Sequence, residues 1–269
     1  KAAEGGKMNA LELLRREAEA TQAVIMAGGE GKRMGYIGVP KPLIRLNGEP
    51  LIDRCIRYLA ENGFHRFIVL TRQEEVAKHL NDSKYGVELS VCMDPPIPKV
   101  GKGKALKHAV LRGTIDITRR VLIAFPDDIF LDRTLPLRFL ASHLEAVRAK
   151  GVWASVAVVS GIQLPYGVVE LDPSGLAVKF EEKPVLRIHA STGLYILEPE
   201  ALQLLVEITD MSSPHAIEFE NTLLPLLAQR RKLYAFTVSQ GAWLPVNTIK
   251  ELEEASAALS EFEATRRDA

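Results

Sequence analysis

Residues 23–34 read AVIMAGGEGKRM, and residues 40–43 read PKPL. The apolar run at 23–26 has the length of a β-strand, and the apolar spacing over 51–61 predicts a helix after it. The glycine-rich segment therefore leaves the end of an early strand, where glycine lets backbone N–H groups approach a ligand closely. Arg33 and Lys41 add two cations downstream. Open backbone amides beside fixed cations predict a polyphosphate site.

This segment differs from the two common phosphate-binding loops. The Walker pattern requires Ser or Thr after Gly-Lys, whereas Arg33 follows Lys32. The dinucleotide pattern requires a third glycine at the position of Met34. A nucleoside triphosphate is therefore a better expectation than a dinucleotide. The simpler alternative is a strand-to-helix turn with solvated basic residues.

The composition excludes several classes of protein. Lys plus Arg equals Asp plus Glu at 34 each, which argues against bulk nucleic-acid binding. No apolar run approaches the roughly 20 residues that span a membrane. The only cysteines, Cys55 and Cys92, lack metal-site spacing and exclude a disulfide scaffold. We expect a cytoplasmic protein, because the charged N-terminus has no apolar signal core.

Strand and helix patterns alternate from residue 22 to residue 150: the predicted strands are 23–26, 66–71, 87–93 and 120–125, and the predicted helices are 51–61, 73–80, 104–113 and 135–150. Shorter strands separated by turns follow Trp153, at 153–160, 167–171, 177–181 and 191–197. Helices are then predicted at 199–208 and 214–228, a strand at 233–239 and a final helix at 248–263. The alternation predicts an α/β fold: a Rossmann-like, mostly parallel mixed sheet sandwiched by helices, with a β-rich second half. Ligands of such sheets bind at the carboxyl ends of the strands. We expect an N-terminal extension with a helix at 1–21 and a single domain at 22–269, divided into 22–150, 151–248 and a C-terminal helix at 249–269.

Two further segments carry candidate site residues. Asp127 and Asp128 follow an apolar strand, and adjacent side chains of an extended chain point to opposite sides. One carboxylate can therefore face bound phosphates and hold Mg²⁺, although an aspartate that caps the next helix is an alternative. Gly101 and Gly103 form a second glycine-rich loop before a predicted helix at 104–113. This loop either lets a flat base approach or simply begins the helix.

Taken in order, these segments resemble the sugar-1-phosphate nucleotidyltransferases from about Gln22 to about Glu254. Within that family they most resemble the bacterial UTP–glucose-1-phosphate uridylyltransferases. Beyond the opening signature, the resemblance rests on Gly101-x-Gly103-x-Ala105, Phe125-Pro126-Asp127-Asp128, Tyr166-Gly167-Val168-Val169-Glu170, Glu182-Lys183-Pro184 and Ser191-Thr192-Gly193-Leu194-Tyr195.

The resemblance implies a role for each group of residues. Arg33 and Lys41 would be catalytic, and Asp127 would hold Mg²⁺. Residues 22–150 would form the nucleotide-binding half, with contacts from Ala27, Gly28, Gly29, Gly31, Lys32, Gly101 and Gly103. Residues 151–248 would form the sugar-phosphate-binding half, with contacts from Tyr166, Gly167, Glu182, Lys183, Ser191 and Thr192.

Two departures from the family pattern affect the site. Ser191 stands where the family often has Asn, so this sugar contact is weakened or supplied by Thr192. Pro245 stands where many members have a second acidic Mg²⁺ ligand, and Asn247 stands where a cytidylyltransferase branch has one. The amide oxygen of Asn247 can bind Mg²⁺ but brings no charge. The sequence therefore leaves two alternatives: Asn247 is a second ligand of Mg²⁺, or Asp127 holds the ion with water and phosphates alone.

The implied reaction is Mg²⁺-dependent transfer of a nucleotidyl group from a nucleoside triphosphate, with UTP favoured, to a sugar-1-phosphate. The products are a nucleoside diphosphate sugar and pyrophosphate. One alternative is transfer to a non-sugar phosphate, such as inositol, choline or cobinamide phosphate. Another is a non-catalytic paralogue that binds a nucleotide sugar. We expect the triphosphate and the sugar-1-phosphate as binding partners, and neither nucleic acid nor membrane. A homo-oligomer is compatible with the sequence.

Overall fold

The computed structural model describes residues 9–29, 38–82, 85–239 and 241–265. The helices are α1 (Ala10–Ala20), the 3₁₀ helix η2 (Lys41–Leu43), α2 (Leu51–Glu61), α3 (Glu74–Asp82), α4 (Gly101–Leu111), α5 (Leu135–Lys150), α6 (Pro199–Ile208), α7 (Phe219–Gln229) and α8 (Ile249–Ala264). The strands are β1 (Gln22–Met26), β2 (Arg45–Leu46), β3 (Glu49–Pro50), β4 (Arg66–Thr71), β5 (Glu88–Met93), β6 (Val121–Ala124), β7 (Asp128–Phe130), β8 (Ala154–Gln163), β9 (Val168–Leu171), β10 (Ala177–Glu181), β11 (Val185–Leu197), β12 (Leu233–Val238) and β13 (Trp243–Pro245).

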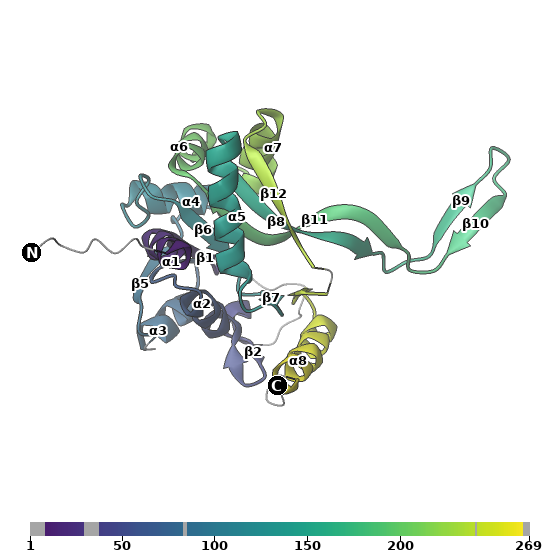
Figure 1. Ribbon diagram of the computed structural model, residues 1–269, viewed down its shortest axis with the longest axis horizontal. Coiled ribbons are helices and arrows are strands. Elements are labelled where there is room, and N and C mark those ends of the chain that lie inside the picture. The colour runs from purple at the N-terminus through teal and green to yellow at the C-terminus, as the bar shows by residue number, and fades with distance from the viewer. Residues whose placement is uncertain (1–8, 30–37, 83–84, 240, 266–269) are drawn as a thin grey trace, which may run out of the picture.

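Seven strands form the central sheet in the order β12-β8-β11-β6-β1-β4-β5. β1 pairs in parallel with β4 and β6, β4 with β5, and β12 with β8. β11 runs antiparallel between β6 and β8. Helices lie on both sides of this sheet (Figure 1). The mostly parallel mixed sheet confirms the predicted α/β class.

The central strand β1 shows why the sheet needs helices on both faces. All five of its residues are buried. Val24 and Met26 belong to the apolar cluster that includes Leu106 of α4 and Leu202 of α6. The alternate residues Ala23 and Ile25 belong to the cluster on the other face, together with Ile56 of α2, Val76 of α3 and Phe139 of α5. Burial of both faces is characteristic of parallel sheets, and it leaves the strand ends as the place for polar chemistry.

A third apolar cluster supports the carboxyl-end side of the sheet. Leu46 of β2, Ile129 of β7, Val246 and Leu259 of α8 pack together there. The antiparallel pair of β7 and β13 aligns Pro245 with Asp128. The Val246 N–H also donates to the Asp127 carbonyl over 2.8 Å. These contacts hold the segment before α8 against the end of β6.

Paired ends of β8 and β11 leave the body and continue into the β9–β10 hairpin, forming a projecting arm (Figure 1). We define the arm as residues 164–188. Every residue of β9 and β10 is exposed. β11 begins at Val185, six residues before the strand that the sequence predicts at 191–197, because its first half pairs with β8. The β-rich second half is thus present, and part of it lies outside the main core.

The structure does not show the expected loop before residue 104; it bears out the alternative that Gly101 and Gly103 begin the helix. Helix α4 begins at Gly101 itself, so both glycines lie in its first turn. The backbone of Ile217 packs against this turn: the Gly103 N–H donates to the Ile217 carbonyl over 2.7 Å. A Cβ on Gly101 would lie 2.6 Å from the Ile217 N and O atoms, and one on Gly103 would lie 2.9 Å from the Ile217 O atom. Close packing of two backbones therefore requires glycine at these positions.

The helix predicted at 214–228 begins later, at Phe219. The short strands β2, β3, β7 and β13 are absent from the sequence expectations, because two- or three-residue strands carry too little periodicity to detect. In the described part of the chain, no helix is long and apolar enough to span a membrane.

Candidate functional site

Four parallel strands end at the same edge of the sheet, and a cavity of about 640 Å³ opens there. The residue after each strand lines this cavity: Ala27 after β1, Arg72 after β4, Asp94 after β5 and Phe125 after β6. Gly28 and Gly29 continue the lining from Ala27. The predicted nucleotide segment therefore lies at the strand-end site that the fold class predicts.

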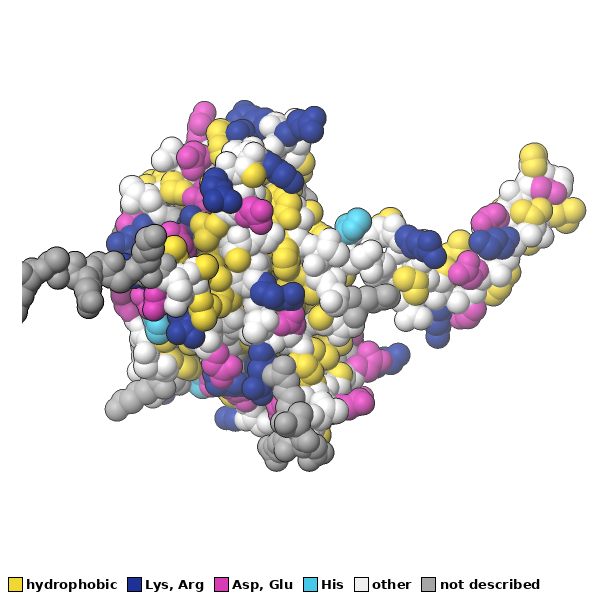
Figure 2. All heavy atoms as spheres, viewed as in Figure 1, with side chains coloured by type: hydrophobic (Ala, Val, Ile, Leu, Met, Phe, Trp, Pro, Cys, Tyr) yellow, Lys and Arg dark blue, Asp and Glu magenta, His cyan; other side chains and the backbone are white. Residues whose placement is uncertain are grey.

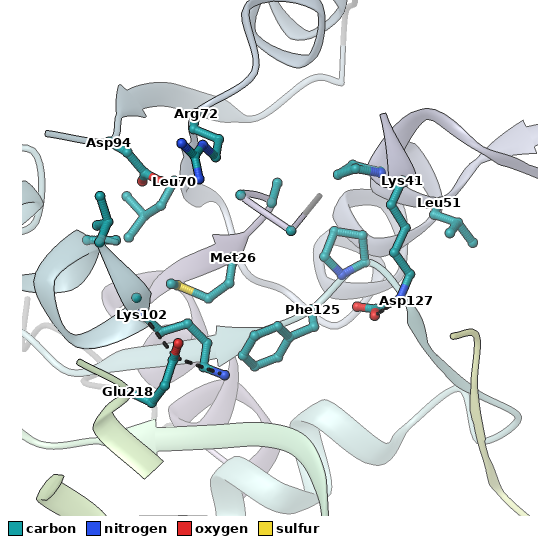
Figure 3. A pocket seen from close by; sticks show the side chains of 18 of the residues that line it. Met26, Lys41, Leu51, Leu70, Arg72, Asp94, Lys102, Phe125, Asp127 and Glu218 are labelled. Atoms are coloured by element: carbon teal, nitrogen blue, oxygen red, sulfur yellow. Dashed lines mark hydrogen bonds and ion pairs between the residues drawn. The ribbon is translucent and has the colours of Figure 1, made fainter. Parts of the chain in front are cut away.

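Lys41 forms the cationic side of the cavity together with two oxygen-bearing residues. Its ammonium group pairs with the Asp127 carboxylate and donates to the Asn247 amide oxygen over 3.2 Å. The Lys41 side chain is only 13% exposed, so this contact is not a solvated surface ion pair. Figure 3 shows Lys41 descending to Asp127 at one end of the cavity. The structure thus brings together three residues that the sequence assigned separately to catalysis and to metal binding.

Each of these three residues is held by its own local structure. Pro40 and Pro42 flank Lys41, and the 3₁₀ turn closes with an N–H donated by Ile44 to the Lys41 carbonyl over 3.1 Å. Asn247 immediately precedes Thr248, the N-cap of α8, and its N–H donates to Glu251 over 2.7 Å. A capping box between Thr248 and Glu251 fixes this helix start.

Asp127 and Asp128 have different partners, as expected for neighbours on an extended chain: Lys41 contacts Asp127, and Trp243 contacts Asp128. The Asp128 carboxylate accepts a hydrogen bond from the Trp243 indole N–H over 2.8 Å. Burial and the nearby charge of Asp127 raise the pKa of Asp128 to about 8, although the Trp243 hydrogen bond opposes this shift. The raised pKa favours the protonated form of Asp128, which is a weaker metal ligand than an ionised carboxylate. Neither aspartate caps the next helix, which was the alternative to metal binding. Asp128 accepts a hydrogen bond from Trp243, and Asp127 accepts one from Lys41.

Gly193 lies against Asp128 and leaves no space for a side chain. It has a φ of +82°, and a Cβ at this position would lie 2.1 Å from the Asp128 Oδ2 atom. The structure therefore explains the glycine in the segment 191–195 without any ligand contact. Its lack of a side chain lets β11 pass over the end of β6.

Helix α4 closes another side of the cavity. The N–H of Lys102 donates to the Glu218 carboxylate over 3.1 Å, and its ammonium group pairs with Glu218 at 3.2 Å and Glu220 at 2.8 Å. Figure 3 shows both contacts of Lys102 to Glu218. The same ammonium lies 5.6 Å from the centre of the Phe125 ring. Lys102 therefore ties the start of α4 to the segment before α7, and its charge is already neutralised by two carboxylates.

Arg72 and Asp94 are cavity residues that the sequence reasoning missed. Figure 3 places them together, across the cavity from Lys41 and Asp127. Their position in the sequence could have identified them. Each directly follows a predicted parallel strand, and Asp127 follows one by only a few residues. Burial raises the pKa of Asp94, whereas the positive charges of Arg72 and His108 lower it.

The predicted site residues fall into three groups. Ala27, Gly28, Gly29, Lys41, Gly101, Asp127 and Asn247 line the cavity. Gly31, Lys32 and Arg33 lie outside the described residues. The cavity lining does not include the predicted sugar-phosphate residues or Gly103; Tyr166, Gly167, Glu182 and Lys183 lie on the projecting arm, and Ser191 and Thr192 lie on β11.

Ser191 and Thr192 make contacts within the protein. The Ser191 hydroxyl donates to the Tyr195 hydroxyl over 2.8 Å and accepts from the Gly193 N–H over 3.3 Å. Thr192 is fully buried, and its hydroxyl donates to the Ala157 carbonyl over 3.0 Å. The structure therefore gives Thr192 a role in joining β11 to β8.

Curated relatives of this chain include sugar-1-phosphate nucleotidyltransferases with different bases in their names. A mannose-1-phosphate guanyltransferase of Kluyveromyces lactis is 28% identical over 241 residues, covering 86% of this chain and 62% of the relative. A UTP–glucose-1-phosphate uridylyltransferase of Synechocystis sp. is 29% identical over 198 residues, covering 67% of this chain and 50% of the relative. The chain thus spans half to 62% of the length of these relatives.

A solved structure from Bacillus anthracis, described as a glucose-1-phosphate thymidylyltransferase, has a similar fold. Its TM-score to this chain is 0.67 with 21% sequence identity, and the match covers 88% of this chain and 94% of that chain. The nucleotidyl transferase family profile matches residues 22–261, which includes the sheet, the cavity and most of α8. The chain therefore belongs to the nucleotidyl transferase family.

Proposed function

We propose that this chain transfers a nucleotidyl group from a nucleoside triphosphate to a sugar-1-phosphate. The observation that carries the proposal is the convergence of Lys41, Asp127 and Asn247 at one end of a strand-end cavity that Gly28 and Gly29 also line. A cavity lined by glycine backbone, a cation and metal-type oxygen ligands is suited to a triphosphate chain.

In the proposed reaction, an oxygen of the sugar-1-phosphate attacks the α-phosphorus. The new P–O bond forms as the bond from the α-phosphorus to the bridging oxygen breaks, and pyrophosphate leaves with that electron pair. The attacking phosphate is already ionised near neutral pH, so no protein base is required. The main obstacle is the repulsion between two anions, and Lys41 would reduce it by neutralising charge at the α-phosphate.

The residues present fit a bound Mg²⁺. Asp127 offers a half-buried carboxylate, and Asn247 offers an amide oxygen that shares Lys41 as a partner. Within the described ranges, no cluster of three His, Cys, Asp or Glu side chains could hold a metal by itself. Mg²⁺ often takes one or two protein carboxylates and completes its shell with phosphates and water. When bound, it would screen the charge of the phosphates.

The position of the arm is a reason to keep non-sugar phosphates as a second class of acceptor. Tyr166 and Lys183, which favoured a sugar phosphate in the sequence, lie on the arm and outside the cavity lining. A non-sugar phosphate therefore belongs in the same test. The expectation of UTP stays a prediction, because the names of the relatives include guanylyl and uridylyl transfer.

We further propose that the arm mediates self-association. Apolar side chains are exposed along it; Leu171, Leu176, Val178 and Phe180 are each 63–68% exposed. Figure 2 shows apolar side chains along the arm between charged ones. A stable dimer buries roughly 800 Å² on each partner, and exposed apolar side chains such as these are the kind of surface that self-association covers. A two-stranded hairpin is also marginal alone and gains stability from a partner.

The proposed activity is tested by a matrix of triphosphates against phosphate acceptors, with Mg²⁺ and pyrophosphate release as the readout. The acceptors should include glucose-1-phosphate, mannose-1-phosphate, and inositol, choline and cobinamide phosphates. We expect release that depends on both a triphosphate and a sugar-1-phosphate. Release only with a non-sugar acceptor would support the second acceptor class, and nucleotide-sugar binding without release throughout the matrix would support a non-catalytic paralogue.

A further inference from the structure

The end of the cavity opposite Lys41 is formed by Asp94. Its backbone N–H donates to the Thr71 carbonyl over 2.8 Å, which fixes it at the end of β5 beside β4. Its carboxylate lies over Gly28, because a Cβ on Gly28 would be 3.3 Å from the Asp94 Oδ2 atom. Figure 3 shows this carboxylate and Arg72 across the cavity from Asp127. The two ends of the cavity thus carry different polar groups.

The Asp94 carboxylate retains open acceptor positions. Among the described residues, no hydrogen bond or ion pair to this carboxylate is found. The residue is half-buried: burial raises the pKa of Asp94, and the positive charges of Arg72 and His108 oppose this shift. A carboxylate that lines a cavity without a protein partner is available to accept hydrogen bonds from a bound ligand.

The walls between the two ends suit a flat ring. Met26 and Leu70 lie between the two ends in Figure 3, and Val100 and Ala105 also give the cavity apolar lining. Since Lys41, Asp127 and Asn247 are at the far end, a triphosphate whose phosphates face them would place its base near Asp94. This step rests on the proposed function.

We propose that Asp94 selects guanine by accepting two hydrogen bonds from its Watson–Crick edge. Guanine presents the N1–H and N2–H donors side by side, which matches the two oxygens of a carboxylate. Uracil and thymine present one N–H between two carbonyl oxygens, so a second carboxylate oxygen would face an acceptor. Cytosine and adenine present their amino donor beside a ring-nitrogen acceptor. The carboxylate therefore favours GTP over the UTP expected from the sequence motifs.

Inosine triphosphate provides a sharp test, because it differs from GTP only in lacking the N2 amino group. Calorimetric titration of the whole chain with GTP, inosine triphosphate and UTP would measure each dissociation constant. We expect GTP to bind at least about tenfold more tightly than inosine triphosphate, as for a hydrogen bond to a charged group. UTP should bind more weakly than GTP by a similar or larger factor.

A matched pair of variants locates the effect. Asp94→Asn should weaken GTP binding about tenfold or more and remove most of the difference between GTP and inosine triphosphate. Asp82→Asn makes the same chemical change at an exposed position of α3 and should leave all three constants unchanged. Circular dichroism would verify that both variants fold.

Two results would overturn the assignment of guanine. One is equal binding of GTP and inosine triphosphate by the unaltered protein, which needs no variant to interpret. The other is tighter binding of UTP than GTP. Failure of the proposed function gives a different result: selective GTP binding would persist, but no triphosphate would release pyrophosphate with any phosphate acceptor.

Discussion

The ammonium group of Lys41 pairs with the carboxylate of Asp127, 86 residues later in the chain. Neither residue is on a long element of the core: Lys41 lies in a 3₁₀ turn, and Asp127 lies between β6 and β7. Their pairing, shared with Asn247, places a cation and two metal-type oxygen ligands at the end of β6. This relationship is the basis of the proposed chemistry.

Asn247→Asp should tighten the binding of the required metal. The new carboxylate would add a negative charge beside Asp127, where the native amide contributes only an oxygen. We expect the Mg²⁺ concentration for half-maximal pyrophosphate release to fall about tenfold, equivalent to about 1.4 kcal/mol. Asn221→Asp makes the same change on the exposed face of α7 and is the control. An unchanged Mg²⁺ requirement would place the metal away from Asn247.

Asp128→Asn should change how stability depends on pH. The pKa of Asp128 is raised to about 8 in the folded protein, above the ordinary value of 3.8. Between these values the unfolded chain loses a proton that the folded protein keeps, so this group lowers the free energy of unfolding by up to about 1.4 kcal/mol per pH unit.

The asparagine variant keeps an oxygen acceptor for Trp243 and lacks this titration. Urea unfolding at pH 5 and pH 8 should therefore show a smaller loss of stability with rising pH for the variant. Parallel pH profiles for the two proteins would show that Asp128 has an ordinary pKa.

Gly193→Ala should destabilise the fold by on the order of 3 kcal/mol. The added Cβ would lie 2.1 Å from Asp128, and the φ of +82° already disfavours a side chain. Gly175→Ala separates these causes, because Gly175 has a φ of +88° and no atom within 4 Å of its added Cβ. We expect a cost of about 1 kcal/mol there from backbone strain alone. Equal costs in thermal or urea unfolding would refute the close contact at Gly193.

The arm should hold copies of this chain together. Val169 of β9 and Phe180 of β10 are cross-strand partners and are both exposed. Replacing both with Ser should shift the protein toward the monomer in size-exclusion chromatography with light scattering. Leu111→Ser removes a similarly exposed apolar side chain at the end of α4 and should leave the assembly unchanged. A monomeric unaltered protein at all concentrations tested would contradict this proposal.

The sequence predicted the longer helices and strands well because their apolar residues are regularly spaced. The predicted bounds of α2, β4, α5, β10 and α6 match the structure, since each has a clear apolar period or turn boundaries. The approach of the Ile217 backbone to Gly101 could not be predicted, because it depends on a contact between residues more than 100 positions apart. The glycines therefore suggested a ligand loop where the structure has a closely packed helix start.

The candidate site was predictable where residues follow strands and unpredictable where distant segments meet. Asp127 and the Gly28–Gly29 segment were identified from strand ends, and the same rule would have identified Asp94. The sequence contains no sign that Asn247 and Asp127 share Lys41, because β7 and β13 are too short to predict. Lys183 was expected at the sugar phosphate, but its segment extends along the arm.

The most direct test of the central claim is the turnover of Lys41→Ala in the pyrophosphate-release assay. Lys78→Ala, an exposed lysine on α3, is the matched control. Loss of a cation that acts mainly in the transition state should lower kcat and kcat/KM together, by about a hundredfold or more, while the unfolding midpoint stays near that of the control. A folded Lys41→Ala variant with the turnover of the control would contradict the claim that nucleotidyl transfer occurs at Lys41.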